Sequence, residues 1–168
     1  RGYKEAGMPL DSVCLDIDYM ERYKDFTVSE QRFPNFADLV ADMRAEGVRL
    51  VPIIDAAVKV EKGYRVYEEG REKGYFCKGA DGKPYVVGVW PGDAVLPDFL
   101  NAGVREWFGE QYRPLLDLGL EGFWNDMNEP SLFYSKKRFR EFAGQYLPHF
   151  LQRVKETDDI GLPVEEFM

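Results

Sequence analysis

Residues 122–130 read G-F-W-N-D-M-N-E-P, and this stretch joins a short strand to a polar turn. The apolar residues at its start predict a buried strand that ends at Asp126. Residues 125–129 carry two carboxylates and two amides. A carboxylate at a strand end can attack an anomeric carbon or transfer a proton. The alternative is a polar turn closed by Pro130, and the residues alone leave both interpretations open.

Two earlier stretches follow the same plan, in which an apolar run ends in an acidic residue. Residues 12–17 read S-V-C-L-D-I and predict a short buried strand with Asp16 near its carboxyl end. Residues 48–54 read V-R-L-V-P-I-I and predict a second strand, which Asp55 closes. Pro52 argues against an ordinary central strand. The run is nevertheless short, β-branched and directly preceded by a helix pattern, so we retain the strand.

Helical patterns separate these strands. A first helix is expected to end at Gly7. Apolar residues at every third or fourth position predict a helix from the N-cap Asn35 to Gly47. Another helix is predicted for residues 102–118, with a kink at Pro114. The alternation of strands and helices predicts an α/β fold with a parallel sheet and helical crossovers.

The middle and the end of the chain add further elements. Residues 80–83 form a turn signal between 75–77 and 85–87, which predicts a hairpin. Residues 90–93 read W-P-G-D and predict a loop. A last helix is expected at 136–155.

The predicted strands bring three carboxylates to one edge of the sheet. Asp16, Asp55 and Asp126 each lie at the carboxyl end of a strand. A single aspartate there usually serves as a cap or turn residue. Because the ends of parallel strands share one face, and because that face carries the active site of a (β/α) barrel, three such residues favour a functional site.

Composition excludes several classes of function. The net charge is −8 and no basic stripe occurs, which argues against a nucleic-acid partner. No apolar run approaches the roughly 20 residues of a membrane span, so we expect no membrane partner. One histidine and two cysteines cannot build a zinc cluster, so we expect no metal and no cofactor. Aromatic residues make up 15% of the chain, which suits a sugar-binding cleft but also a large core.

The cysteines give a weaker indication. Cys14 lies within an apolar strand pattern and is predicted to be a buried, inert thiol. Such cysteine usage favours a reducing compartment, and we therefore expect a cytoplasmic location. No signal peptide opens the chain, but Arg1 is not a natural start, so we expect an upstream segment.

Several segments, in the same order, resemble glycoside hydrolase family 31. Residues 122–130 are similar to the nucleophile signature of that family, in which the Asp before Met is the nucleophile. The stretch L-D-I-D-Y-M at 15–20, with K-D-F-T at 24–27, resembles the second barrel strand and its loop. The stretch V-P-I-I-D at 51–55 resembles the third barrel strand.

The resemblance extends to the loop before the fourth strand. The stretches V-W-P-G at 89–92 and P-D-F at 97–99 resemble its substrate-lining loop. The match runs from about Gly7 to Tyr134. It implies a fragment of a (β/α)8 TIM barrel, roughly the second to fourth strands with their crossover helices, so that residues 1–168 would be part of one catalytic domain.

The resemblance implies roles for individual residues. Asp126 would be the nucleophile, and Asp16 would bind hydroxyl groups deep in the sugar subsite. The other implied site residues are Ile17, which would line that subsite, Ile53 and Trp90, which would form an apolar wall, Met127, which would flank the nucleophile, and Asp55 and Glu129, which would support the site. Ordinary strand packing is the alternative for Ile17 and Ile53, and Phe123 and Trp124 could equally be core residues.

The resemblance also implies what residues 1–168 do not supply. The general acid/base of the family is an Asp on a later loop than Asp126, and the closing residues 161–168, G-L-P-V-E-E-F-M, carry no such motif. The first barrel strand would precede Arg1. We therefore expect the isolated chain to be inactive.

The expected function is that of a retaining α-glycosidase, similar to an α-glucosidase, which removes terminal α-linked glucose from oligosaccharides through a covalent intermediate on Asp126. Two alternatives stay open. In a clan of β-glycosidases the fourth strand ends in N-E-P, and Glu129 would then be the acid/base. A carbohydrate-binding relative without catalysis is the other. The sequence does not determine the sugar, the linkage or the oligomeric state.

Overall fold

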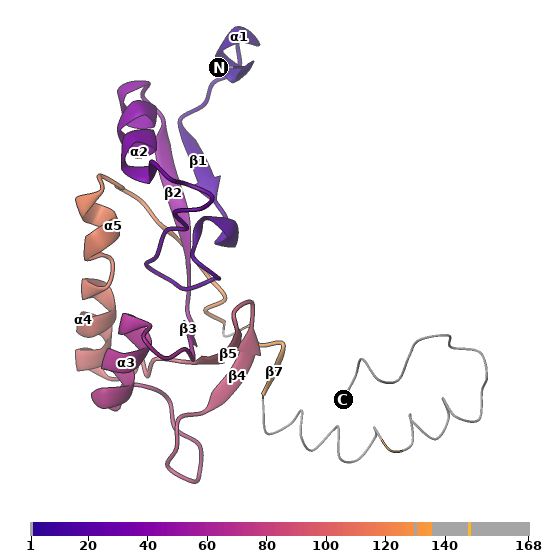
Figure 1. The fold of residues 1–168 in the computed structure, drawn as a ribbon, viewed down its shortest axis with the longest axis vertical. Helices are drawn as coiled ribbons and strands as arrows, with labels where there is room; N and C mark the ends of the chain where they lie inside the picture. Colours follow the sequence, from indigo (N-terminus) through magenta and orange to yellow (C-terminus); the bar gives the residue numbers. More distant parts are fainter. Residues whose placement is uncertain (1, 130, 136–147, 149–168) are drawn as a thin grey trace, which may run out of the picture.

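The computed structural model describes residues 2–129, 131–135 and 148 of the chain. In Figure 1 the helices α2, α5 and α4 follow one another along one side of the long strand β2, and a smaller sheet lies beyond the end of that strand. The helix expected at 136–155 lies outside the described residues, apart from position 148.

All three predicted strands lie in one three-stranded parallel sheet. Its strands are β1 (Ser12–Leu15), β2 (Arg49–Asp55) and β6 (Trp124–Asp126), in the order β1-β2-β6. Both pairings are parallel, and the register sets Asp55 opposite Asp126. The predicted α/β alternation with a parallel sheet is therefore confirmed.

Pro52 is accommodated in the central strand by the way the neighbours are staggered. It pairs with Leu15 of β1 in the register, whereas β6 joins β2 only from Ile53 onward. At Pro52, β2 is therefore paired with β1 but not with β6. The missing N–H of the proline therefore interrupts no hydrogen-bond ladder with β6.

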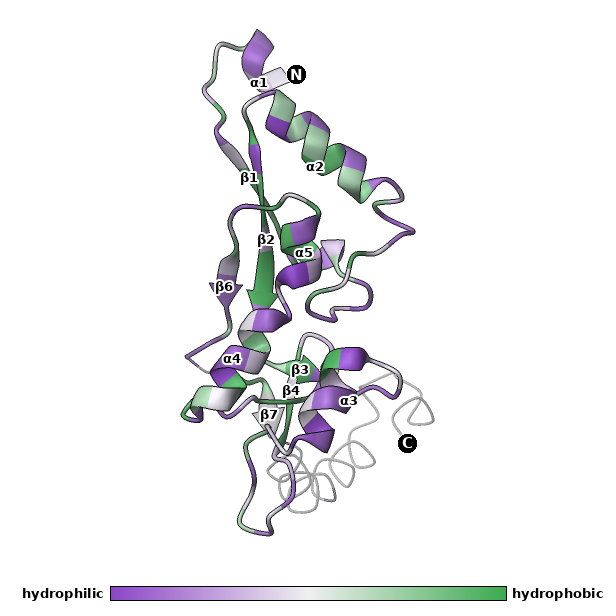
Figure 2. Cartoon of the chain, turned by 90° about the vertical axis from the view of Figure 1, so that its left-hand side faces the viewer, coloured by the Kyte–Doolittle hydropathy of each residue, from purple (hydrophilic) through white to green (hydrophobic). Residues whose placement is uncertain are grey.

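Helices cover one face of this sheet and enclose the core. They are α2 (Phe36–Ala45), α4 (Ala102–Glu110) and α5 (Arg113–Asp117). The largest buried cluster combines apolar side chains of β2 and of these helices, among them Leu50, Ile54, Val40, Val104, Phe108 and Leu115. In Figure 2 the lower half of β2 is green, the colour of hydrophobic residues. The described residues also form α1 (Gly2–Glu5), the 3₁₀ helix η1 (Ile17–Tyr19) and α3 (Arg65–Glu72).

Two helix predictions need correction. Asn35 precedes α2 as predicted, but its side chain makes no capping hydrogen bond there; it is Asn101 that caps α4, through Gly103 N–H. The single kinked helix predicted for 102–118 is two helices, α4 and α5. Pro114 lies in the first turn of α5, where its missing N–H leaves no helical bond unmade, so the chain breaks before it.

A second, antiparallel sheet lies beyond the carboxyl end of β2. It contains β3 (Val58–Lys59), β5 (Gly92–Val95), β4 (Val86–Val89) and β7 (Tyr134–Ser135), in the order β3-β5-β4-β7. The predicted hairpin around the turn at 80–83 is present, but it is short. It consists of the antiparallel Lys78–Pro84 bridge, the Tyr85 N–H bond to the Cys77 carbonyl and the Gly79 N–H bond to the Lys83 carbonyl, whereas the longer pairing of β4 is with β5.

The loop predicted at 90–93 is correspondingly shorter. Val89 pairs with Gly92, so Trp90 and Pro91 alone form the tip of the β4–β5 hairpin. Gly92 has φ +89°, a conformation that glycine adopts without steric cost, and it lets the chain re-enter the sheet at once.

The prediction that Cys14 is buried is wrong. Its side chain is exposed. Side chains alternate along β1, and Val13 and Leu15 take the positions that pack against the core beneath the helices. Cys14 therefore points to the opposite face, which the described helices do not cover. The predicted cytoplasmic location rested in part on a buried Cys14, and it stays a prediction without that support.

Candidate active site

Three carboxylates lie at the carboxyl ends of adjacent parallel strands. Asp16 follows β1, Asp55 ends β2 and Asp126 ends β6. Asp55 and Asp126 are paired in register, so their side chains share a face of the sheet. Cys14 pairs with Val51. Asp16 lies two positions after Cys14, and Asp55 lies four positions after Val51. Because residues at even spacings along a strand share a face, Asp16 lies on the same face as Asp55. The sequence prediction that these acids converge is confirmed for their position in the sheet.

Asp55 is the carboxylate most affected by its surroundings. Its side chain is 6% exposed, and Oδ1 has no hydrogen-bond partner among the described residues. Burial, together with the nearby carboxyl groups of Asp126 and Asp16, raises the pKa of Asp55 to about 6. The three acids therefore form one electrostatic cluster, in which a proton or a hydroxyl donor at Asp55 relieves repulsion.

The backbone after Asp126 fixes the orientation of that side chain. Oδ1 of Asp126 accepts a hydrogen bond of 2.8 Å from Met127 N–H. Met127 has φ +58°, a left-handed conformation that is uncommon for residues other than glycine. The turn carries the Met127 side chain onto the hairpin cluster that contains Val87 and Ala94. Strained residues of this kind concentrate at functional sites, where the surrounding structure holds them in place.

Asp16 is held in a similar way at the end of β1. Its Oδ1 accepts a hydrogen bond of 2.8 Å from Ile17 N–H and caps η1. Ile17 is half-buried against a cluster of Tyr19, Met20 and Ile53. Ile53 is 2% exposed, and the Tyr19 hydroxyl donates to its carbonyl at 2.9 Å. In this structure Ile53 is a packing residue, and its contact with a sugar stays a prediction.

Two tryptophans present exposed ring surface, one at the β4–β5 hairpin tip and one on β6. Trp90 at the hairpin tip is 51% exposed, and its ring lies edge-on to Phe133, with the centroids 4.8 Å apart. Trp124 is 38% exposed and lies two residues before Asp126 on the same face. The sequence left open whether Trp124 is a core residue, and its exposure argues against that alternative.

A small cavity adjoins two of the acids. It measures about 320 Å³, and Asp55 and Asp126 contribute to its wall. Aromatic side chains near α4, among them Phe108 and Tyr112, line another part of the wall. The Tyr112 hydroxyl donates to Asn125 Oδ1 at 2.8 Å, a contact that no sequence motif indicated. An aromatic wall beside carboxylates suits a ligand with both apolar faces and hydroxyl groups.

Asp25 is a second residue that sequence reasoning missed. It is 2% exposed, and its Oδ1 accepts the backbone N–H of Asp55 at 2.9 Å. Its own carbonyl accepts from the Tyr64 hydroxyl at 2.8 Å. Burial raises the pKa of Asp25 well above its usual range, although the Asp55 N–H opposes that rise. The K-D-F-T motif contained this residue, but nothing in the motif indicated that Asp25 anchors the end of β2.

The remaining predicted residue, Glu129, lies exposed beyond Met127. Within the part of the chain that the structure describes, no group of three or more His, Cys, Asp or Glu side chains could hold a metal ion. Among the same residues, none of the helices combines the length and the apolar character needed to cross a bilayer.

Comparison with known proteins decides the family. Residues 1–156 match the model of the glycosyl hydrolases family 31 TIM-barrel domain. The chain belongs to glycosyl hydrolase family 31. An α-glucosidase 2 from Bacillus thermoamyloliquefaciens is 49% identical over 133 residues, which cover 79% of this chain and 17% of that protein.

Solved structures of family 31 members agree with this assignment. A DNJ-bound glucosidase II α subunit is 34% identical with a TM-score of 0.74, and the alignment covers 79% of this chain and 15% of that one. A family 31 α-glucosidase from Bacteroides thetaiotaomicron is 36% identical with a TM-score of 0.70, over 79% of this chain and 22% of its own. The resemblance read from the motifs is confirmed, and the chain spans less than a quarter of each of these family 31 proteins.

Proposed function

We propose that the protein containing this chain is a retaining α-glycosidase of the α-glucosidase type, which removes terminal α-linked glucose from oligosaccharides. The observation that carries the proposal is the cluster of Asp16, Asp55 and Asp126 on one face at the ends of adjacent strands. In a (β/α) barrel this edge is the catalytic one. We further propose that β1, β2 and β6 are the second, third and fourth strands of that barrel.

Asp126 is the nucleophile in this proposal. Its Oδ1 is engaged by Met127 N–H, so we assign the attack on the anomeric carbon to Oδ2. The attack forms a β-glycosyl ester and breaks the α-glycosidic bond, whose oxygen receives a proton from a second carboxyl group. Water then attacks the ester from the opposite face, and the product regains the α configuration. We propose that the proton donor lies outside residues 1–168, as the family resemblance implies.

Asp16 and Asp55 bind the sugar in this proposal. Asp55 offers a buried acceptor oxygen without a partner among the described residues, and a substrate hydroxyl would supply one. Trp90 and Trp124 offer exposed ring surface for the apolar faces of the sugar. Glu129 is exposed, and we assign it a supporting role. The match to the family 31 barrel domain disfavours the β-glycosidase alternative.

Covalent trapping tests the assignment of the nucleophile. The intact protein is incubated with 5-fluoro-α-glucosyl fluoride, and peptide mapping should locate the sugar on Asp126. An Asp126→Gly variant should lose several powers of ten in turnover, each worth about 1.4 kcal/mol of barrier. Azide should restore turnover of an activated substrate and yield the β-glucosyl azide, because it enters from the face that the carboxylate vacated.

The matched control is Glu129→Gln, three residues further along the same loop. It should keep far more activity than Asp126→Gly. A label on Glu129, or an α-azide product, would exclude Asp126 as the nucleophile and favour the β-glycosidase alternative.

A further inference from the structure

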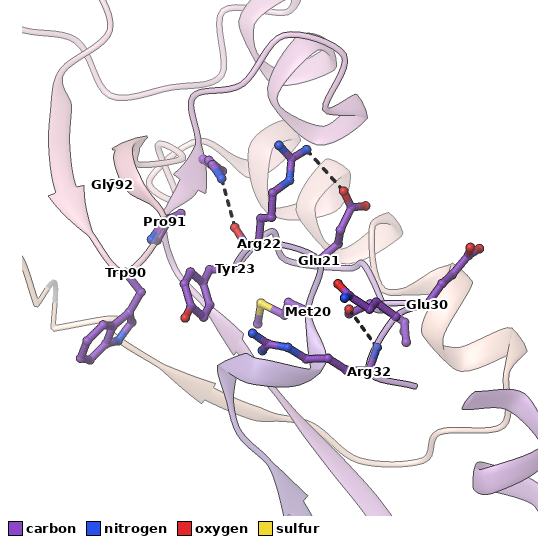
Figure 3. Close-up of a pocket in the computed structure, with 13 residues that line it drawn as sticks. Met20, Glu21, Arg22, Tyr23, Glu30, Arg32, Trp90, Pro91 and Gly92 are labelled. Atoms are coloured by element: carbon purple, nitrogen blue, oxygen red, sulfur yellow. Dashed lines mark hydrogen bonds and ion pairs between the residues drawn. The ribbon is translucent and has the colours of Figure 1, made fainter. Parts of the chain in front are cut away.

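The loop between η1 and α2 carries three consecutive residues with buried side chains. Lys24, Asp25 and Phe26 are 7%, 2% and 7% exposed. The preceding residues 21–23 instead line an open cavity of about 1090 Å³ at the β4–β5 hairpin tip, and Figure 3 shows their side chains there. Charged side chains are almost never buried so deeply unless they are paired, so the partners of residues 24–26 indicate what the segment does.

Lys24 and Asp25 attach the segment to the residues in front of α3. The Lys24 ammonium pairs with Glu61 at 3.2 Å and with Glu21 at 3.3 Å. The Tyr64 hydroxyl donates to the Asp25 carbonyl at 2.8 Å. The segment is therefore anchored at two consecutive residues.

The Asp25 side chain takes the place of a neighbouring strand beside the end of β2. β1 pairs with β2 only as far as Pro52. Beyond that residue, the Tyr19 hydroxyl donates to the Ile53 carbonyl at 2.9 Å. Asp25 Oδ1 likewise accepts the N–H of Asp55 at 2.9 Å, which satisfies a buried backbone donor. Asp25 therefore holds the backbone of the residue whose carboxylate we assign to sugar binding.

Phe26 supports the strand on the other side of β2 through aromatic contacts. Its ring lies edge-on to Tyr112, with the centroids 4.9 Å apart, and Phe123 meets Tyr112 in the same manner at 4.8 Å. The Tyr112 hydroxyl donates to Asn125 Oδ1 at 2.8 Å. Asn125 directly precedes Asp126 on β6, so this series of contacts ends beside the proposed nucleophile.

The backbone of Phe26 is strained. Its φ is +62°, a left-handed value that is rare for a bulky side chain. Residues held in such conformations concentrate at functional sites, because the surrounding structure has to compensate for the strain. Here the strained residue directly follows Asp25, at the point where the loop supports both strands.

We infer that Asp25 and Tyr112 are positioning residues for the proposed reaction, which hold Asp55 and Asp126 in place relative to one sugar ring. Asp25 acts on Asp55 through the backbone N–H, and Tyr112 acts on Asp126 through Asn125. The inference rests on the proposed function. Asp55 would bind the sugar before and during the reaction, whereas Asp126 forms its bond only in the reaction, so the two positioning residues should affect different constants.

Covalent trapping of the intact protein by 5-fluoro-α-glucosyl fluoride separates the two effects. Ki for this reagent measures binding, and the limiting rate kinact measures attack by the nucleophile. Asp25→Ala should raise Ki about tenfold and leave kinact within about threefold, and Asp25→Asn, which keeps an acceptor oxygen, should restore most of the affinity. Tyr112→Phe should lower kinact about tenfold and leave Ki within about twofold, because it misplaces the nucleophile without removing a sugar contact.

Controls separate positioning from stability. Every variant is measured well below its Tm, so that loss of folded protein enters neither constant. Tyr67→Phe removes a hydroxyl on α3 that takes part in none of these contacts, and it should change neither Ki nor kinact. Tyr64→Phe removes the donor to the Asp25 carbonyl and should raise Ki about threefold, so it replaces Asp25→Ala if that variant does not fold.

Each outcome decides one of the two proposals. If the wild type is labelled on Asp126, three results would overturn the inference and leave the proposed function standing. They are unchanged constants in either arm, parallel changes of Ki and kinact in both arms, and a failure of Asp25→Asn to restore Ki. If the wild type were not labelled, or were labelled elsewhere, the proposed function would fail and the inference with it.

Discussion

Replacing Asp55 by asparagine should stabilise the protein at neutral pH and have little effect in acid. Asp55 is buried at the end of β2, and Oδ1 has no partner among the described residues. Burial, with Asp126 and Asp16 adding to it, raises its pKa from 3.8 to about 6. Because the folded state binds the proton more tightly than the unfolded state, this contribution to stability is complete below about pH 4 and is lost as the pH rises through about 6.

The magnitude follows from the size of that rise. At about 1.4 kcal/mol per pH unit, a pKa raised from 3.8 to about 6 makes the ionised form roughly 3 kcal/mol less favourable in the folded protein. Solvent at the open strand end screens part of this, which leaves about 1–2 kcal/mol. Asparagine keeps the shape of the side chain and removes the charge. The Asp55→Asn variant should therefore gain about 1–2 kcal/mol above pH 7 and lose sugar binding.

Calorimetry of the intact protein at pH 4.5 and pH 7.5 measures the effect. At about 2–4 °C per kcal/mol for a domain of roughly 200 residues, the Tm of Asp55→Asn should exceed that of the wild type by roughly 2–8 °C at pH 7.5 and by much less at pH 4.5. Asp42→Asn, an exposed acid on α2, is the matched control and should show no such dependence. A Tm difference for Asp55→Asn that is the same at both pH values, or larger in acid, would refute the electrostatic account.

Two further pairs of variants test the packing that supports the site. A Cβ at Gly70 in α3 would overlap the Phe76 ring and lie 2.8 Å from Trp107, so Gly70→Ala should cost about 1–3 kcal/mol, whereas Gly109→Ala in α4 meets open space and should gain up to ~1 kcal/mol. Equal shifts of the urea midpoint for these two variants would contradict the packing. Asp25→Ala leaves the buried Asp55 N–H without an acceptor and should lower stability by about 1–3 kcal/mol, whereas Asp25→Asn keeps an acceptor oxygen and should cost less than half as much. If both Asp25 variants lowered the Tm equally, the hydrogen bond to Asp55 would not be what anchors β2.

The sequence predicted the parts of the fold that depend on local pattern. Apolar runs ending at Asp55 and Asp126 became parallel strands, because alternating strands and helices leave few other arrangements. Local pattern was incomplete where the partner of a segment mattered. It predicted the short hairpin around 80–83 but not the longer pairing of residues 86–89 with Gly92–Val95, which Gly92 permits through a two-residue tip at Trp90 and Pro91.

Burial was the other property that local pattern could not determine. The run around Cys14 is apolar, but a strand covered on one face exposes alternate residues, and the register alone decides which ones. For the site, the identities of the acids were predictable from the motif resemblance. The support from Asp25 and Tyr112 was not, because these side chains reach across 30 and 13 positions of sequence to Asp55 and Asn125.

The electrostatics of the cluster give a physical reason for its place at the strand ends. Three carboxyl groups in one region repel one another, and Asp55 also lacks a partner for a buried oxygen. Such an arrangement lowers stability in the empty protein at neutral pH, which is the usual cost of a site prepared for a ligand. A sugar relieves it, because its hydroxyl groups are neutral donors that each satisfy a carboxylate without adding charge. On this reasoning a polyol should raise the Tm of the wild type more than that of Asp55→Asn, since only the wild type keeps the charged acceptor that the hydroxyl satisfies.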